Sequence, residues 1–197
     1  MVDLDDWPEM IVHAVCRSGD CSPHRRRTLA AIVRLAAELA HEGREGRRVG
    51  TLMIIGDVEA VLGRSRPLIL DPLAGHDRQA RHVGDRSLRE TVKELAQLDG
   101  AFVVDDSGIF VSAARFIEVS LAATERLPIG LGARHAAAAS ISKVADAVAV
   151  AVSESSLVVS LLRVNCRRKS RPSCFLRVRT PRSLSTTQLC TNSRRWD

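Results

Sequence analysis

The sequence predicts a single α/β domain, with a central mixed, twisted β-sheet flanked by helices. Segments with helical periodicity alternate with a hairpin signal and short apolar runs along one chain of 197 residues, a pattern typical of sheets covered by helices. A hydrophobic content of 45% is enough to fill one core. We therefore divide the chain into an N-terminal segment (1–27), one domain (28–159) and a tail (160–197).

The first half of the domain is predicted to contain a helix, a buried strand and a short helix. Residues 28–42 place their apolar side chains on one helical face, with Thr28 as the N-cap and Gly43 as the stop. Residues 49–55 are apolar and partly β-branched, which favours a buried strand. Residues 57–62 indicate the short helix.

A polar excursion and another amphipathic helix follow. Residues 64–86 combine prolines with many charges and are expected to cross the surface. Residues 87–98 have an apolar stripe at helical spacing. Ser87 and Glu90 are spaced as a capping box, so this helix is predicted to begin at Ser87.

The second half is predicted to contain a hairpin, a third helix and an interior strand. Apolar residues 101–104 and 109–113 flank the turn sequence DDSG at 105–108, which indicates a β-hairpin. A helix over 132–144 then precedes 147–152 (AVAVAV), an apolar run typical of a strand inside a sheet.

The net charge of +6 is a property of the tail. Residues 160–197 hold ten basic residues and one acidic residue, so the tail carries +9 and the rest of the chain −3. Few aromatic side chains are present for base stacking, so nucleic-acid binding is not expected of the domain. The tail is expected to be disordered. The alternatives are an arginine-rich RNA-binding arm, or a segment made foreign to the domain by a shift of reading frame.

The expected location is the cytoplasm, without membrane association. No apolar run is long enough to span a bilayer, and the acidic N-terminus does not resemble a signal peptide. The five cysteines do not form a disulfide pattern and are expected to stay reduced. His13, Cys16, Cys21 and His24 are spaced for a compact zinc site, and the alternative is a surface loop that happens to contain them.

Residues 130–139 (GLGARHAAAA) join a glycine-rich turn to the start of the third helix. Glycine permits close approach of a ligand to the backbone, and the first helical turn favours an anion. Arg134 offers a donor fork for phosphate oxygens, and His135 can donate a hydrogen bond or bind a metal. The alternative is an ordinary helix start with two solvated polar residues.

Two other motifs place carboxylates beside strands. Asp99-Gly100-Ala101 lies between a helix and the first hairpin strand. Ser153-Glu154 follows the interior strand directly, at a carboxyl end where α/β sheets often bind ligands. Taken singly, each motif is also explained by a solvated turn.

Together, the three motifs resemble the diadenylate cyclase domain family, and its archaeal members more closely. LDGAFVV opens a strand, LGARHAAAASIS opens a helix and VAVAVSESS closes a strand, over roughly residues 30–159. The resemblance implies the fold of that domain and a nucleotidyltransferase that joins two ATP molecules into cyclic di-AMP with release of two pyrophosphates. It also implies Mg²⁺ or Mn²⁺ as cofactor, and a homodimer or higher homo-oligomer in which two domains meet face to face.

The resemblance also assigns roles to residues. Asp99 is expected to orient the ribose 3′-hydroxyl or help remove its proton, and Arg134 and His135 to hold the triphosphate. Glu154 is expected to bind the metal, together with Ser153. The residues expected to contact ATP are Gly100, Ala101, Phe116, Gly130, Leu131, Gly132, Ala133, Arg134, His135 and Ser153.

Three positions differ from the family pattern. Ala136 replaces the second arginine of the family's Arg-His-Arg motif, Ala133 stands where many members have threonine, and Leu157 stands where glycine is usual. These differences leave an alternative function open, an adenine-nucleotide-binding regulator with the same fold and impaired catalysis.

Overall fold

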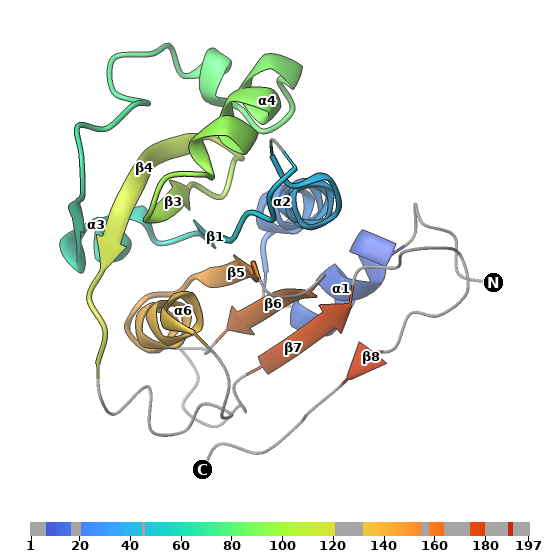
Figure 1. Ribbon diagram of the computed structural model, residues 1–197. Coiled ribbons are helices and arrows are strands. Elements are labelled where there is room, and N and C mark those ends of the chain that lie inside the picture. The colour runs from blue at the N-terminus through green and yellow to red at the C-terminus, as the bar shows by residue number, and fades with distance from the viewer. Residues whose placement is uncertain are drawn as a thin grey trace.

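A computed structural model describes residues 7–16, 21–44, 46–120 and 132–154, together with the backbone of three later strands (Figure 1). The elements in chain order are α1 (Trp7–Val15), α2 (Pro23–Glu42), β1 (Thr51–Ile55), α3 (Val58–Gly63), β2 (Ser65–Pro67), the 3₁₀ helix η1 (Gln79–Arg81), α4 (Arg86–Leu95), β3 (Ala101–Val104), β4 (Phe110–Ile117), α6 (Ala133–Val144), β5 (Val148–Val152), β6 (Val158–Arg163), β7 (Cys174–Arg179) and β8 (Leu189–Cys190). The predicted class, an α/β domain with a mixed sheet, is confirmed.

One sheet, with strand order β2-β4-β3-β1-β5-β6-β7-β8, organises the molecule. β1 and β3 are parallel, and every other neighbouring pair is antiparallel. Leu52 near the start of β1 is opposite Ala101 at the start of β3, and Thr51 is opposite Val152 at the end of β5. The starts of β1 and β3 and the end of β5 therefore lie at the same end of the sheet.

The sheet has an apolar core on each face. α2 and α6 both pack against β1, β5 and β6, and they belong to different core clusters because they cover opposite faces. Figure 1 shows the central strands lying between these two helices. The valines of β5 face the core of α2, whereas its alanines face the core of α6. The AVAVAV sequence thus gives the alanine-rich α6 a surface of small side chains against which to pack closely.

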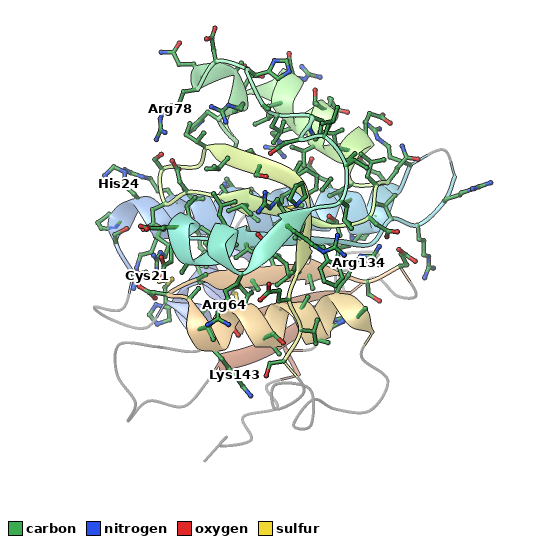
Figure 2. All side chains as sticks on the ribbon, turned by 90° about the vertical axis from the view of Figure 1, so that its left-hand side faces the viewer. Cys21, His24, Arg64, Arg78, Arg134 and Lys143 are labelled. Atoms are coloured by element: carbon green, nitrogen blue, oxygen red, sulfur yellow. A yellow bond between two sulfur atoms is a disulfide. The ribbon has the colours of Figure 1, made fainter. Side chains whose placement is uncertain are left out.

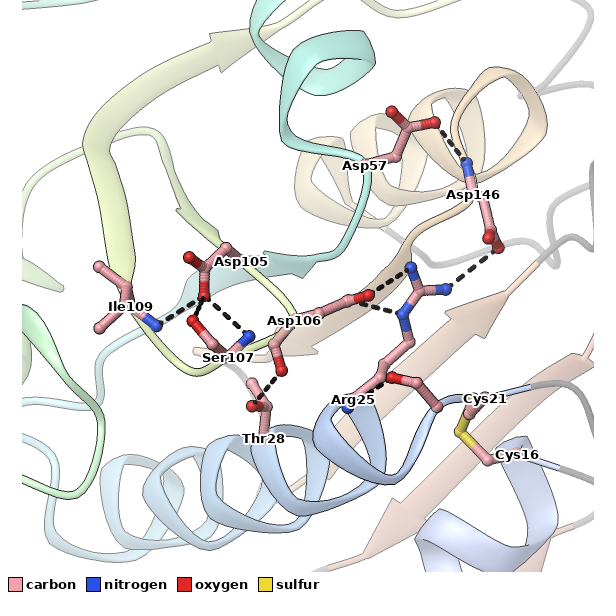
Figure 3. A network of polar contacts seen from close by, with 11 residues as sticks. Cys16, Cys21, Arg25, Thr28, Asp57, Asp105, Asp106, Ser107, Ile109 and Asp146 are labelled. Carbon is pink, nitrogen blue, oxygen red and sulfur yellow. Dashed lines mark hydrogen bonds and ion pairs between the residues drawn. A yellow bond between two sulfur atoms is a disulfide. The ribbon is translucent and has the colours of Figure 1, made fainter.

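The predicted beginnings of two helices are wrong. α2 begins at Pro23 rather than at Thr28, because the Ser22 side chain accepts a hydrogen bond from the Arg25 amide and proline is favourable in the first helical turn. Thr28 lies inside α2, where its hydroxyl donates to the carbonyl oxygen of Asp106 (2.9 Å; Figure 3). The predicted stop at Gly43 is confirmed.

The helix predicted to start at Ser87 is α4, whose N-cap lies two residues earlier. Asp85 is its N-cap, since a carboxylate oxygen of Asp85 accepts from the Leu88 amide at 2.9 Å. Glu90 does not complete a capping box with Ser87. It pairs instead with Lys93 and Arg44, so its side chain links α4 to the segment after α2.

Two regions predicted to lack regular structure contain strands. β2 lies within the polar excursion over 64–86, where it pairs with β4. β6, β7 and β8 continue the sheet beyond residue 159, although disorder was expected of residues 160–197. In both places the order comes from backbone pairing with a neighbouring strand, which leaves little trace in composition.

The N-terminal cysteines are bonded to each other, which corrects two expectations. α1 ends just before Cys16, and Cys21 directly precedes Ser22, the N-cap of α2. The Cα atoms of the two cysteines are 5.5 Å apart, and a disulfide joins them (Figure 3). They are therefore not reduced in this structure, and their sulfurs are not available as zinc ligands. Among the described residues, no group of three or more metal-binding side chains occurs.

The described helices include none with both the length and the apolar character needed to cross a bilayer.

Candidate active site

A cleft of about 620 Å³ opens at the end of the sheet where β1 and β3 start and β5 ends. This volume is ordinary for a small-molecule site. The structure gathers ten of the twelve predicted site residues there: Asp99, Gly100, Ala101, Phe116, Gly132, Ala133, Arg134, His135, Ser153 and Glu154. The other two, Gly130 and Leu131, lie outside the described residues.

Gly100 shapes the wall beside Asp99. Its φ is +110°, and an added Cβ would lie 2.7 Å from the carbonyl carbon of Ala114 and 2.8 Å from its Cα. Because both obstacles are backbone atoms, only glycine fits here. Ala114 itself has a positive φ (+51°) at an irregularity in the β3–β4 pairing. The backbones at the start of β3 and in β4 are therefore very close together. The side chain of Asp99, just before β3, is 92% exposed at the mouth of the cleft.

The start of α6 forms the opposite wall. Gly132 is the N-cap and has no side chain to accept from the first helical amides, and Gly132, Ala133, Arg134 and His135 all line the cleft. His135 is buried, with 7% of its surface exposed. A helix start of this kind favours a negatively charged group.

Arg134 lies between two carboxylates from separate segments, one just before β3 and one just after β5. Its Nη1 is 2.8 Å from Glu154 Oε1, and its Nη2 is 3.7 Å from Asp99 Oδ1. Figure 2 shows where Arg134 lies relative to the ribbon of α6. All three side chains are at least partly exposed, and such pairs contribute roughly 0–1 kcal/mol each. A phosphate chain can therefore replace the carboxylates around the guanidinium at little cost.

The remaining wall is apolar and comes from β4 and the excursion before it. Phe116 is 42% exposed, and the guanidinium of Arg66 lies over its ring at 4.7 Å from the centroid. Leu68, Ile117 and Val119 complete this wall. The cleft therefore has one charged end and one flat apolar side.

The sequence model of one protein family, described as "DAC: DisA bacterial checkpoint controller nucleotide-binding", matches residues 38–165. This chain belongs to that family. It is 47% identical over 139 residues to a protein named diadenylate cyclase from Methanocaldococcus jannaschii, covering 71% of this chain and 43% of the relative. It is 41% identical over 124 residues to a diadenylate cyclase from Haloferax volcanii, covering 63% of this chain and 45% of the relative. The chain thus spans less than half the length of these two relatives, and the predicted family resemblance is confirmed.

A crystal structure from Bacillus cereus, described as that of a hypothetical membrane spanning protein, has a similar fold. The TM-score is 0.50 at 18% sequence identity, over 82% of this chain and 85% of that one. At this identity the likeness concerns the fold alone.

Several residues of the DAC cleft were missed by sequence reasoning. Leu68 reaches the cleft because its amide donates to the Ala114 carbonyl (2.9 Å) beside the β2–β4 pair, and nothing local in the sequence indicates that pairing. Arg115 lines the cleft while its guanidinium donates to the carbonyl of Ser65 (2.9 Å), which holds β2 onto β4. In the sequence, the only indication that Arg115 belongs to the cleft was its position next to Phe116, which was predicted to contact ATP.

The carboxylates of the cleft are groups that could hold a divalent metal. Mg²⁺ is usually held in proteins by one or two carboxylates while phosphate oxygens and waters complete its shell. Glu154 and Asp99 offer two such groups within reach of one guanidinium. The described residues hold no third acidic or histidine ligand grouped with them. Glu154 could therefore hold a divalent cation such as Mg²⁺ or Mn²⁺ whose remaining ligands are phosphate oxygens and waters.

Proposed function

We propose that this chain is a diadenylate cyclase, which condenses two ATP molecules into cyclic di-AMP and releases two pyrophosphates. The observation that carries the proposal is the convergence of Asp99, Arg134 and Glu154 on one cleft in a member of the DAC family. The charged end of the cleft suits a triphosphate, and the apolar side with Phe116 suits a purine ring.

The reaction needs positioning and charge rather than a covalent nucleophile. Each ribose 3′-oxygen forms a bond to the α-phosphorus of the other ATP, the bond from that phosphorus to the pyrophosphate breaks, and the hydroxyl proton is released. Phosphoryl transfer of this type depends mainly on in-line geometry and on stabilising phosphate charge.

The cleft residues divide this work among them. Asp99, exposed at the mouth, orients the 3′-hydroxyl and helps to remove its proton. Arg134 and the first turn of α6 bind the phosphates, with buried His135 beside them. Glu154, which pairs with Arg134 here, would hold Mg²⁺ or Mn²⁺ once phosphate oxygens replace it at the guanidinium, with Ser153 next to it. The metal neutralises phosphate charge when bound.

The product requires a second copy of the chain. Cyclic di-AMP has two-fold symmetry, so two clefts, each with one ATP, have to face one another. Exposed apolar side chains support this arrangement. Leu68 and Val119 line the cleft and are 38% and 44% exposed, and the next two residues after Leu68 in the chain, Ile69 and Leu70, are 49% and 94% exposed. A surface of this kind at the mouth of a site is typical of an interface.

The test is incubation of the protein with ATP and Mn²⁺, followed by chromatographic identification of the product. Cyclic di-AMP is expected from the wild type, in proportion to the dimer measured by light scattering. Asp99→Asn should retain ATP affinity and lose product formation by roughly 10²-fold or more, because it removes the base while preserving shape.

An adenine-nucleotide-binding regulator is the second candidate, and Ala136 is the observation that favours it, since the family's second arginine is missing there. The two candidates give different results. Wild-type protein that binds ATP as a dimer but forms no cyclic di-AMP would exclude the cyclase and support the regulator.

A further inference from the structure

Gly50 lies directly before β1, beside the side chains of Arg134 and Glu154, which line the cleft. Thr51 is opposite Val152, so Gly50 is adjacent to the turn that carries Ser153 and Glu154. An added Cβ on Gly50 would lie 2.7 Å from Glu154 Cγ, 2.9 Å from Arg134 Nη1 and 3.0 Å from Glu154 Oε1. The ion pair between Arg134 and Glu154 therefore rests on the bare backbone of Gly50.

We propose that Gly50 is a positioning residue for the cyclase reaction: its lack of a side chain sets the depth at which Arg134 and Glu154 sit in the cleft. The inference rests on the proposed function, because those two groups are the ones assigned to the phosphates and the metal. Gly50 is not itself catalytic, since it acts through the two side chains above it.

The geometry separates this role from a folding role. The φ of Gly50 is not positive, so alanine accepts its backbone conformation. The three nearest atoms that a Cβ would meet belong to the side chains of Arg134 and Glu154 rather than to the backbone, so these two side chains are the groups that have to shift. At Gly56, by contrast, φ is +100° and a Cβ would lie 2.8 Å from the backbone oxygen of Asp146. A methyl group at 50 displaces site groups, whereas one at 56 strains the fold.

A small displacement is sufficient to impair catalysis. Misplacing a catalytic group by about 1 Å reduces turnover by roughly 10²-fold when the reaction depends on alignment. Gly50→Ala is therefore expected to lower kcat by roughly 10²-fold while the urea midpoint stays close to that of the wild type.

The matched control is Gly63→Ala. Gly63 also lacks a positive φ, and nothing lies within 4 Å of an added Cβ, so the same chemical change is made in open space. Gly63→Ala should form product at the wild-type rate. The inference is wrong if Gly50→Ala forms product as fast as Gly63→Ala, or if it loses as much stability as Gly56→Ala.

A second measurement does not depend on product formation. ATP affinity with Mn²⁺ is measured by calorimetry for the wild type, Gly50→Ala, Glu154→Ala and the double variant. If Gly50 acts through Glu154, the fold-loss in affinity caused by Gly50→Ala is smaller once Glu154 has been truncated. Equal fold-losses in both backgrounds overturn the inference. Wild-type protein without product but with this non-additivity refutes the cyclase and retains the role of Gly50.

Discussion

Arg134 has a donor geometry that a simple positive charge cannot reproduce. Its two terminal nitrogens point toward carboxylates from two separate segments, Asp99 before β3 and Glu154 after β5. A planar guanidinium can make both contacts at once because its donors form a fixed fork. The residue therefore lies near both acidic groups at once, at 2.8 Å from Glu154 and 3.7 Å from Asp99.

Arg134→Lys is expected to lower kcat by roughly 10²-fold, because an ammonium replaces the fork with one point donor at a site where transition-state charge must be stabilised. Steady-state cyclic di-AMP synthesis measures the effect. Arg34→Lys is the control, because Arg34 is half-exposed on α2 and its ion pair with Glu9 is long, at 3.9 Å. Equal activities of the two variants would contradict the role of the fork.

At the residue scale, local motifs predicted the charged half of the cleft. Asp99, Arg134 and Glu154 each follow or open an element whose boundaries are visible in the sequence. Gly50 and Leu68 were not predicted, because their importance arises only from neighbours that belong to β5 and β4. Close approach between distant segments has no signature in a single sequence.

The β3–β4 hairpin is closed by one carboxylate. Asp105 accepts hydrogen bonds from the amide and hydroxyl of Ser107 (2.8 and 2.6 Å) and from the amide of Ile109 (3.0 Å; Figure 3). Burial raises the pKa of Asp105, but these hydrogen bonds and the charge of Arg78 outweigh it, so the pKa lies below its usual value. The carboxylate form is thus the one that the folded hairpin favours.

Asp105→Asn should reduce the free energy of unfolding by about 1–2 kcal/mol at pH 7, because hydrogen bonds to a charged acceptor contribute about 1.5–3 kcal/mol and the asparagine oxygen retains weaker, neutral ones. A lowered pKa contributes stability above the unfolded value, near 4, and loses it as pH falls through the folded pKa. Urea unfolding at pH 7 and at the lowest pH where the protein stays folded measures the difference. A difference that stays constant with pH would show that the charge of Asp105 is not involved.

At the element scale, the sequence predicted which segments are helices and strands better than where they begin. Thr28 and Ser87 are acceptable caps, yet Ser22 and Asp85 are the caps that the structure uses. The choice depends on tertiary contacts: the Thr28 hydroxyl donates to Asp106 in the hairpin turn, so α2 gains by extending past it. Residue type alone does not distinguish a cap from a helix-interior threonine with a distant partner.

Arg25 joins three parts of the molecule. From the first turns of α2 it contacts Asp106 in the hairpin (2.7 Å) and Asp146 before β5 (3.2 Å), and only 8% of its side chain is exposed (Figure 3). Burial lowers its pKa, but Asp106 and then Asp146 outweigh burial and raise it, so the guanidinium stays charged. The amide of Asp146 in turn donates to Asp57 before α3 (3.1 Å).

Arg25→Met is expected to reduce the free energy of unfolding by about 2–3 kcal/mol, because it leaves two carboxylates near a buried site without their partner. Urea denaturation measures the loss, and the slope with urea should not change. Arg34→Met is the surface control. A loss no larger than that of the control would mean that water replaces the guanidinium without cost.

At the scale of the whole molecule, the class of fold was predictable and the strand order was not. Alternating periodicities are sufficient to indicate a sheet covered by helices. Whether β1 pairs with β3 in parallel and with β5 in antiparallel depends on connections that composition does not specify. The later strands were missed for the same reason, since β6 is stabilised by its ladder with β5.

The pairing of β1 with two strands from distant parts of the chain also affects the order of events during folding. The cleft is complete only after both ladders have closed, and the ladder with β5 joins the segments of greatest separation in sequence, which are expected to meet late. Partly folded chains therefore lack the cleft. A ligand of the cleft therefore binds only the folded protein. By mass action, it shifts the folding equilibrium toward the folded state.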